Sequence, residues 1–582
     1  MKILLLSSAY NGLTQRVHVE LLQRGHTVSV ELAINEQTML EGVQLFKPDI
    51  IICPFLKHRV PESIWKHYVC VIVHPGIKGD RGASSLDWAI QNKETEWGVT
   101  ALQAAAEMDA GDIWATATFK MRPGTKSSIY TVEVTEAAVK VVLQTLDRFQ
   151  DANFKPEPLD YSKSEVRGRL QPNMKQVDRR IDWQTESTDT ILDKINAADG
   201  SPGVLDVLFG KEYFLHGATK EDNLQGITGA LLATRLGAVC RATVDGAIWL
   251  SHLKPKAVNG DKPSFKLPAT VILGDKVSDL PEIPVSIYHS TPNTFREIWY
   301  EEKNDVGYLH FDFHNGAMST EQCLRLRDAV VEVRNRPTRV LVLMGGRSAW
   351  SNGVHLNVIE AASNPAEESW HNINAIDDLI YAILTTSTKI TVAAVHGNAG
   401  AGGVLLALAC DKVCVRSGVV FNPHYKSMGL YGSEYWTYTL PRRVGYDKAL
   451  EITQGCLPMG MPEAKQIGLV DFIIPEMFAA FDNKLEMMTE SLAQSNNYER
   501  ILESKALRRS HDEFVKPLKV YRQEELRRMR EDFYKPNSLY HPARKEFVYK
   551  MPCKGTPERL ALHRHSDDAE NRVLALRENK AD

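Results

Sequence analysis

The sequence predicts an α/β multidomain protein, in which two α/β domains are separated by a small β-barrel and followed by a helical tail. The chain has 582 residues with 43% hydrophobic content, which is too much for one ordinary core. Short apolar runs alternate with amphipathic stretches near the N-terminus and again in the second half. Between them lie short strands separated by turn residues. The predicted domains cover residues 1–160, 170–275, 295–480 and 481–582.

Charge and cysteine content exclude several classes of protein. With 69 basic and 73 acidic residues the net charge is -4, so the chain lacks the cationic excess of a protein held on nucleic acid. The apolar run Ile3–Leu6 is shorter than the roughly 7–15 residues of a signal-peptide core, and no stretch reaches the ~18 apolar residues of a membrane helix. The eight cysteines are scattered, which predicts a cytoplasmic protein without a metal site.

The first 160 residues carry the pattern of a parallel sheet with helices on both faces. Ligands of such sheets bind beyond the carboxyl ends of the strands, and His74 directly follows one of the apolar runs. We therefore expect chemistry near His74. The expected strands are Ile3–Ser7, Thr27–Leu32, Ile50–Cys53 and Val69–Val73, with a helix at Arg16–Arg24.

A series of short motifs surrounds His74. His74-Pro75-Gly76 is followed by Arg81-Gly82-Ala83, by Gly98-Val99-Thr100 and by Met108-Asp109-Ala110-Gly111-Asp112. This order resembles the formyltetrahydrofolate-dependent formyltransferases, and the spacing from Gly98 to Asp109 matches that family without a gap. The resemblance implies a Rossmann-like fold with His74 and Asp109 as catalytic residues. The folate-binding residues that it implies are Pro54, Phe55, Leu56, Arg81 and Met108.

The residue types at this site suit formyl transfer. The reaction needs a group that manages the proton of the nucleophile and a group that stabilises charge on the carbonyl oxygen. A carboxylate close to an imidazole favours the protonated ring and fixes its orientation, so His74 and Asp109 can share these tasks. A lone histidine at a strand end is more often structural, but the ordered set of motifs favours the catalytic interpretation.

One residue departs from the formyltransferase pattern. The family has an Asn two residues before its histidine, where the amide stabilises the oxyanion, whereas this chain has Ile72. Ile cannot donate a hydrogen bond, and losing such a donor commonly costs about 2.7–4 kcal/mol of transition-state stabilisation. Either another donor replaces it or the acceptor is less demanding. A thiol acceptor, with an ordinary pKa of about 8.5, fits the second case.

The segment from 170 to 275 predicts a small OB-like β-barrel. Turn residues such as Gly210-Lys211 and Val244-Asp245-Gly246 separate its short strands. Its Asp182-Trp183 start and the strand pair at 243–250 resemble the C-terminal domain of methionyl-tRNA formyltransferase.

A second α/β pattern runs from about 295 to 480. Ala393-Ala394-Val395-His396-Gly397-Asn398-Ala399-Gly400-Ala401-Gly402-Gly403 leads into Cys410-Asp411, and this resembles the oxyanion-hole segment of the crotonase (enoyl-CoA hydratase/isomerase) superfamily. The resemblance implies that the amides of Val354 and Gly402 bind a thioester oxygen. The rival interpretation of the glycines is a Rossmann phosphate loop. Expected elements are a strand at Val306–Phe313 and helices at Gln322–Arg334, Ile376–Leu384 and Gly402–Ala409.

The carboxylates of a hydratase are missing from this segment. Counting from Cys410-Asp411 places them at Leu405 and Tyr425. Leu405 cannot transfer a proton, and a tyrosine of pKa about 10 is a weak acid. We therefore predict Tyr425 and the nearby Glu434 as the acid–base pair, with either residue as the base. The alternative is a packed tyrosine and a surface glutamate.

The two halves together indicate a function. Their order, with Tyr425 and Glu434 in the second half, is similar to the HypX (HoxX) family of [NiFe]-hydrogenase maturation proteins. That resemblance implies two cofactors, N10-formyl-tetrahydrofolate and coenzyme A. Formyl would pass to CoA, and formyl-CoA would be decarbonylated to CO for the hydrogenase iron, with other maturation proteins as partners.

Two other functions are compatible with the sequence. The first is a formyltransferase that acts on an amine, joined to a half that hydrolyses or isomerises a separate acyl-CoA. The second is a CoA-binding scaffold for hydrogenase maturation partners, without turnover. CoA binding without reaction would distinguish the scaffold from the enzymes.

Overall fold

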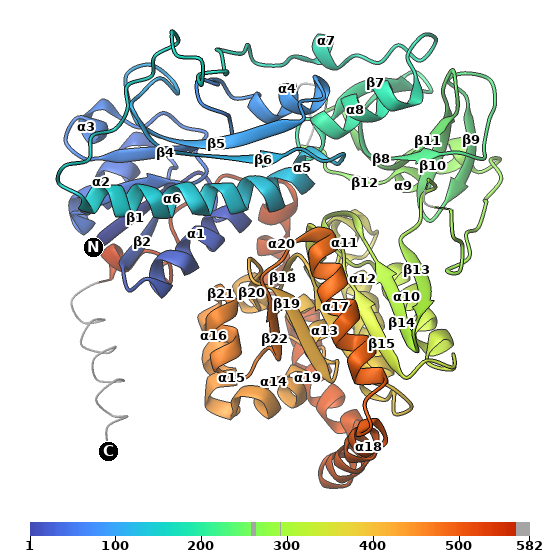
Figure 1. Ribbon diagram of the computed structural model, residues 1–582. Coiled ribbons are helices and arrows are strands. Elements are labelled where there is room, and N and C mark those ends of the chain that lie inside the picture. Colours follow the sequence, from blue (N-terminus) through green and yellow to red (C-terminus); the bar gives the residue numbers. More distant parts are fainter. Residues whose placement is uncertain (258–262, 292, 566–582) are drawn as a thin grey trace, which may run out of the picture. The chain divides into compact units, whose positions relative to one another are not determined.

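The computed structural model describes residues 1–257, 263–291 and 293–565, and the chain divides into two compact units (Figure 1). The first unit contains Met1–Pro123, Ile129–Met174 and the C-terminal segment from Pro552. The second unit contains Gly124–Ser128 and Lys175–Met551. The predicted tail 481–582 is thus shared by the two units, and its residues 566–582 lie outside the described part.

The first unit contains a six-stranded sheet with strand order β2-β1-β3-β4-β5-β6. The neighbouring strands β2, β1, β3 and β4 are parallel, as the sequence predicts, but β5 runs antiparallel to β4. The prediction of a parallel sheet is wrong for β5. The β5–β6 hairpin joins antiparallel neighbours, so β6 points in the same direction as β4 again. The strands are β1 (Lys2–Ser7), β2 (Thr27–Leu32), β3 (Ile50–Cys53), β4 (Cys70–His74), β5 (Glu96–Gln103) and β6 (Ile113–Lys120).

Helices cover both faces of this sheet. α6 contacts β5, β6 and α1 on one face, while α2 contacts β1, β2 and α3 (Figure 1). Burial on both faces explains why β3 and β4 are nearly continuous apolar runs. The helices of this unit are α1 (Gly12–Gln23), α2 (Glu36–Phe46), α3 (Glu62–Trp65), α4 (Ser85–Gln91) and α6 (Thr135–Gln150), with a π-helical turn at Tyr130–Val134. The short helix α5 (Lys126–Ile129) belongs mostly to the second unit.

The C-terminal segment covers the edge strand β2. The Val30 amide donates to the Leu560 carbonyl at 2.9 Å. The buried Glu31 carboxylate accepts hydrogen bonds from Thr556, His563 and Arg564. An uncovered edge strand is prone to pair with other chains, so this segment protects the sheet.

The second unit begins with a small antiparallel sheet of order β7-β8-β11-β10-β9, with β12 paired to β11. Its core contains Trp183, Ile191 and Leu250, and α8 lies against β8. The elements are α7 (Gln176–Arg179), α8 (Thr188–Ala198), β7 (Val204–Leu208), β8 (Lys211–Glu221), β9 (Leu231–Arg235), β10 (Ala238–Ala242), β11 (Ala247–Pro255), β12 (Leu267–Pro268) and α9 (Ala269–Leu273).

A larger α/β domain follows, with the sheet order β13-β14-β15-β17-β19-β22 and a second sheet β16-β18-β20-β21. All strands from β14 to β22 in the larger sheet are parallel. The strands are β13 (Ile298–Lys303), β14 (Val306–Phe311), β15 (Val340–Met344), β16 (Ala349–Ser351), β17 (Ile390–Val395), β18 (Asn398–Gly400), β19 (Lys412–Arg416), β20 (Val420–Asn422), β21 (Met459–Gly460) and β22 (Phe472–Ile474).

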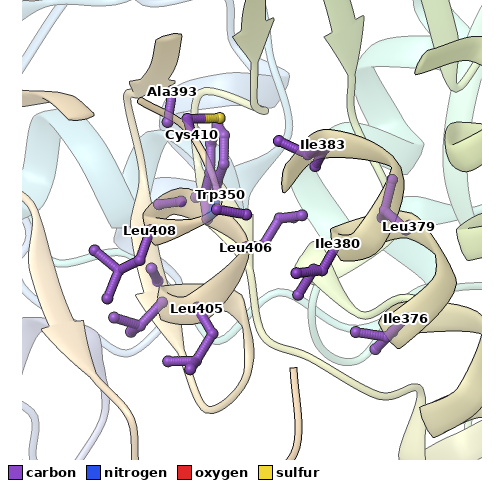
Figure 2. Packing of buried hydrophobic residues seen from close by; sticks show 14 of the residues in the cluster. Trp350, Ile376, Leu379, Ile380, Ile383, Ala393, Leu405, Leu406, Leu408 and Cys410 are labelled. Atoms are coloured by element: carbon purple, nitrogen blue, oxygen red, sulfur yellow. The ribbon is translucent and has the colours of Figure 1, made fainter. Parts of the chain in front are cut away.

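Two apolar clusters cover the faces of the larger sheet. One face packs against α17, and the other packs against α10, α12 and α13. Figure 2 shows the side chains of α12 and α13 in this second cluster, among them Ile380 and Leu406. The helices are α10 (Thr320–Val333), α11 (Leu356–Ala361), α12 (Pro365–Leu384), α13 (Gly403–Leu408), α14 (Trp436–Val444), α15 (Tyr446–Gly455) and α16 (Met461–Gln466).

The C-terminal helices pack on this domain. α17 contacts β14, β15 and β22, α19 contacts α12 and α14, and α20 contacts α11 and α19. Within the described residues, no helix is long and apolar enough to cross a membrane. These helices are α17 (Phe478–Ala493), α18 (Tyr498–Val515), α19 (Leu518–Tyr534) and α20 (Tyr540–Val548).

Candidate active sites

The first candidate site lies at the end of β4. His74 is the last residue of this strand, lies opposite Thr100 of β5 and is only 4% exposed. Asp109 lies in the loop between β5 and β6, where its backbone is left-handed with a φ of 50°. The structure thus brings together the two residues that the sequence predicts to be catalytic.

Two carboxylates hold the His74 imidazole. Nδ1 lies 3.6 Å from Asp109 Oδ2, and Nε2 lies 2.8 Å from Asp80 Oδ2. The same oxygen of Asp109 accepts a hydrogen bond from the Gly82 amide at 3.1 Å. The hydrogen bond to Asp80 therefore fixes the orientation of the ring, and Asp109 places a negative charge close to Nδ1.

The surroundings of His74 favour its protonated form. Burial acts to lower its pKa, but the hydrogen bond to Asp80 and the charges of Asp109 and Asp80 outweigh burial and raise the pKa above the ordinary 6.5. A protonated imidazole at the end of β4 can hold negative charge that develops on a carbonyl oxygen.

Sequence reasoning missed Asp80. Glycine at position 76 leaves room for Asp80 to reach the ring. A Cβ at this position would lie 2.4 Å from both His74 Nε2 and Asp80 Oδ2. The one signal in the sequence is a carboxylate six positions after the histidine in a glycine-containing loop. Such a loop has no periodicity from which its path can be read.

We expect Asp80→Asn to lower the pKa of His74, because the amide keeps the shape of the side chain but removes the negative charge beside Nε2. An NMR titration of the His74 imidazole measures this change. Asp112→Asn, in an exposed position after Asp109, is the matched control. An unchanged pKa in Asp80→Asn would show that Asp80 does not hold the ring.

Arg81 stabilises the loop that carries Asp109. Its Nε donates to the Met108 carbonyl at 2.9 Å, and its guanidinium pairs with Glu107 at 2.7 Å. The Met108 side chain is 65% exposed. Of these two predicted folate-binding residues, Met108 can contact a ligand with its side chain, while the Arg81 guanidinium is already bonded to the loop.

The other predicted folate-binding residues follow β3. Pro54 is buried, and Leu56 is partly buried against the apolar cluster of the sheet. The Phe55 ring meets Tyr130 edge-on, with the centroids 6.3 Å apart. Arg59 donates to the carbonyl of Ala106, and this bond joins the loop after β3 to the loop that carries Met108.

Ile72 lies where the resemblance places an amide donor. It is opposite Leu102 in the sheet and packs, partly buried, against the apolar cluster around β3. Its side chain cannot stabilise an oxyanion by hydrogen bonding. At this position the site therefore lacks the amide donor that the resemblance implies.

In the second candidate site, the two predicted oxyanion donors lie on neighbouring loops. Gly353, which precedes Val354, has a φ of 73°, and a Cβ on it would lie 3.3 Å from the Gly402 amide nitrogen. Among the described residues, the amides of Val354 and Gly402 have no hydrogen-bond acceptor. Two adjacent, unused N–H groups can bind one carbonyl oxygen.

Tyr425 and Glu434 lie in the same site as these amides. A Cβ on Gly402 would meet Glu434 Oε1 at 2.0 Å, and a Cβ on Gly432 would meet Tyr425 Cε2 at 2.4 Å. Glycine at these two positions makes room for the two side chains. The structure thus brings together all four residues that the sequence predicts for this site.

Both acid–base candidates are buried. Tyr425 and Glu434 are each 4% exposed, so the alternative of a surface glutamate is wrong. The Tyr425 hydroxyl has no hydrogen-bond partner within the described part of the chain. A buried hydroxyl without a partner is costly in a folded protein, and it is commonly explained by a function.

Burial changes the pKa of both groups. It raises the pKa of Glu434 to about 8, with a further contribution from the charge of Asp377 and an opposing hydrogen bond from the Ser433 amide. Burial and the charge of Glu434 also raise the pKa of Tyr425 well above its ordinary value of 10.0. Tyr425 therefore keeps its proton near neutral pH, whereas Glu434 exchanges one.

The position of the first hydratase carboxylate is apolar. Leu405 lies on α13, is 0% exposed and belongs to the core beside α12 (Figure 2). The site therefore lacks the pair of carboxylates with which a hydratase activates water.

A basic cluster lies near the oxyanion loops in the second unit. His252 stacks on His314 with the ring centroids 4.1 Å apart, and Lys266 Nζ lies 3.3 Å from His314 Nε2. Asn315, the next residue, accepts a hydrogen bond from Asn352 at 2.7 Å. Burial lowers the pKa of Lys266 and His252, and the charge of Asp199 partly opposes this effect at Lys266.

Comparisons with protein families match three parts of the chain. The Formyl transferase family matches residues 1–146, and the Formyl transferase, C-terminal domain family matches residues 173–262. The Enoyl-CoA hydratase/isomerase family matches residues 301–535. A methionyl-tRNA formyltransferase of Streptococcus agalactiae is 28% identical over 202 residues, which cover 34% of this chain and 62% of the relative.

Two relatives match the chain over nearly its whole length. The hydrogenase maturation factor HoxX of Bradyrhizobium diazoefficiens is 46% identical over 565 residues, 97% of each chain. The crystal structure of HypX from Aquifex aeolicus in complex with tetrahydrofolic acid is 44% identical, superposes with a TM-score of 0.93 and covers 97% of this chain and 99% of that chain. The chain therefore belongs to the HypX/HoxX family of hydrogenase maturation factors and joins a formyl transferase to an enoyl-CoA hydratase/isomerase-like domain.

Proposed function

We propose that the chain transfers formyl from N10-formyl-tetrahydrofolate to CoA and decarbonylates formyl-CoA to CO and CoA. The CO would supply the active-site assembly of a [NiFe] hydrogenase, in the cytoplasm and together with other maturation proteins. One observation carries this proposal: the His74–Asp109 pair and an oxyanion site with Tyr425 and Glu434 are encoded in one chain.

The first unit supports folate as the formyl donor. The HypX relative from Aquifex aeolicus was solved with tetrahydrofolic acid. In this chain the loops after β3 and β5 are joined by the Arg59–Ala106 hydrogen bond, and the loop after β5 carries Asp109. We assign these loops, with Phe55 and Met108, to the folate.

In the first step, the sulfur of CoA attacks the formyl carbon. The new S–C bond forms, negative charge develops on the formyl oxygen, and the protonated His74 stabilises it. The N10–C bond then breaks, and N10 takes up one proton in exchange for the proton that the CoA thiol released, so that formyl-CoA and tetrahydrofolate remain. Asp109 and Asp80 keep the imidazole protonated and aligned. A thiolate nucleophile suits a site in which Ile72 supplies no additional donor.

In the second step, the Val354 and Gly402 amides bind the oxygen of formyl-CoA. Glu434 removes the formyl C–H proton, and the electrons of that bond become the carbon lone pair of CO. The C–S bond breaks with its electrons on sulfur, which takes a proton, so that formyl-CoA yields CO and CoA without a further reactant. Tyr425 donates a hydrogen bond to the departing sulfur, because its raised pKa keeps it protonated.

The pH dependence of the second step should follow Glu434. A carboxyl with a pKa of about 8 is ionised in only about a tenth of the molecules at pH 7. If the carboxylate is the base, CO release from formyl-CoA rises with pH and levels off above about pH 8. Initial rates between pH 6 and pH 9 at saturating formyl-CoA measure this profile. A rate that falls over this range would make Glu434 the acid.

The basic cluster in the second unit supports CoA as the second cofactor. CoA carries phosphate groups, and the Lys266 ammonium with the neighbouring rings of His252 and His314 offers hydrogen-bond donors to them. We expect Lys266→Met to raise the KM for formyl-CoA about tenfold, since a charge-assisted hydrogen bond is lost. Lys220→Met, at a partly exposed position on β8 where the lysine pairs with Asp189, is the control. An unchanged KM would place the phosphates elsewhere.

Supplying formyl-CoA directly to the full chain tests the second step alone. CO detected by the spectral shift of haemoglobin would support decarbonylation. Formate without CO would make the second half a hydrolase, and tight CoA binding without any product would favour the scaffold.

A further inference from the structure

The loop that carries Glu434 has an unusual backbone. Glu434 and Tyr435 are consecutive non-glycine residues with φ of 62° and 55°, in the left-handed region. Residues other than glycine rarely adopt this conformation because it costs free energy, and it persists only where the surrounding structure imposes it. The contacts of this loop therefore show what holds Glu434 in place.

Carboxylates on two helices bind the backbone of this loop. Asp377 of α12 accepts from the Glu434 amide at 2.9 Å and from the Ser433 hydroxyl at 2.9 and 3.0 Å. Glu525 of α19 accepts from the Tyr435 amide at 2.9 Å and from the Thr437 amide at 2.8 Å. Both carboxylates are 0% exposed.

The helix α19 supplies further contacts to the loop. Asp532 accepts from the Tyr431 amide at 2.7 Å, and the Met529 sulfur lies 3.2 Å from the Gly432 amide nitrogen. Arg522 joins α19 to α12 through Asp378 at 2.6 Å and lies 3.7 Å from Asp377. The C-terminal helix α19 therefore forms one wall of the second site.

We propose that Asp377 and Glu525 are positioning residues of the second site, which hold the left-handed backbone at Glu434 and Tyr435 and thereby direct the Glu434 carboxyl towards the Cα of Gly402. This inference rests on the proposed catalytic role of Glu434. Sequence comparison with a hydratase could not reveal it, because the two carboxylates lie on helices far from Glu434 in the sequence and bind main-chain atoms.

One of the two carboxylates, Asp377, also affects the titration of Glu434. Burial raises the pKa of Glu434, the charge of Asp377 raises it further, and the hydrogen bond from the Ser433 amide opposes both. Other ionisable groups beside this loop are Glu525, Tyr425, Asp532, Cys323 and the partly buried Arg522. The titration of Glu434 therefore tests the contact with Asp377, and amide exchange tests the contact with Glu525.

Glu525→Gln is the sharpest test, because each oxygen of Glu525 accepts from a different backbone amide. A glutamine has the same shape but must present its NH₂ group to one of the two N–H groups, which leaves that bond unmade. We expect the Tyr435 and Thr437 amides to exchange with deuterium about tenfold faster, or more, in the full-length variant. Glu524→Gln, on the exposed side of α19, is the matched control. If Glu525→Gln fails to fold, Ser433→Ala removes the hydroxyl that donates to Asp377.

Asp377→Asn tests the effect on charge. The infrared band of the protonated Glu434 carboxyl, assigned by its loss in Glu434→Gln, should disappear at a lower pH in Asp377→Asn than in the wild type. In parallel, the kcat of CO release from formyl-CoA should fall at least about tenfold in Glu525→Gln, with little change in KM. This split is expected when substrate binding is intact and the reacting group is misplaced.

The outcomes separate the two claims. Unchanged amide exchange and an unchanged Glu434 titration would refute positioning by these carboxylates. Faster exchange with wild-type CO release would refute it as well. If the wild type releases no CO, the proposed function fails, while amide exchange and the infrared titration still decide whether Asp377 and Glu525 hold Glu434.

Discussion

Replacing His74 with alanine should abolish formyl transfer and leave decarbonylation intact. His74 is held between Asp80 and Asp109, and in the proposed first step it stabilises charge on the formyl oxygen. Removing a residue with this task commonly costs about 10²–10⁴-fold in rate. We expect CoA formylation from formyl-tetrahydrofolate to fall by about three orders of magnitude, measured as formyl-CoA plus CO. CO release from added formyl-CoA should remain within about twofold of the wild type.

His67→Ala is the matched control for this experiment, because His67 is an exposed histidine of the same unit. It should leave both rates unchanged. Residual formyl transfer close to the wild-type rate in His74→Ala would remove His74 from the mechanism. Loss of both activities would indicate that the substitution damages the fold, and circular dichroism of the variant distinguishes that case.

Tyr425→Phe and Glu434→Gln should block the second step, so that formyl-CoA accumulates. The phenylalanine removes a hydroxyl that has no partner in the described part of the protein, and the glutamine keeps the shape of Glu434 but cannot accept the formyl proton. Loss of an acid–base group predicts a fall in CO release of about 10²–10⁴-fold. Chromatography of the reaction mixture with formyl-tetrahydrofolate and CoA measures the accumulated thioester.

Exposed residues of the same kinds serve as controls for the second site. Tyr446→Phe changes a tyrosine that is 66% exposed, and Glu451→Gln changes a glutamate on the same helix, α15. Both should release CO as the wild type does. CO release at the wild-type rate in Tyr425→Phe and in Glu434→Gln would contradict the proposed second step.

The sequence predicts much of the fold because apolar periodicity reflects burial directly. β2 and β3 begin and end where their apolar runs do, and β14 covers most of the expected strand. The reversed direction of β5 could not be read from these runs, since a buried strand has the same pattern in either direction. The start of α12 at Pro365 was also missed, because its first turns are polar.

The candidate sites were predictable where a motif carries the chemistry. His74, Asp109, Val354 and Gly402 lie in segments whose order resembles known families, and the structure brings each pair together. Their roles stay predictions until they are tested. The supporting carboxylates carry no such signal, because a side chain that binds a distant main-chain amide leaves no spacing in the sequence. Asp80, Asp377 and Glu525 became visible only as contacts in the folded chain.

The most direct test of the coupled pathway follows the carbon atom. Purified full-length protein is supplied with N10-[13C]formyl-tetrahydrofolate and CoA, and CO is trapped by haemoglobin and identified by infrared spectroscopy. The proposed function predicts 13CO that requires both coenzymes and disappears in both His74→Ala and Tyr425→Phe. Label found in formate or in a formylated amine, with no 13CO, would contradict it.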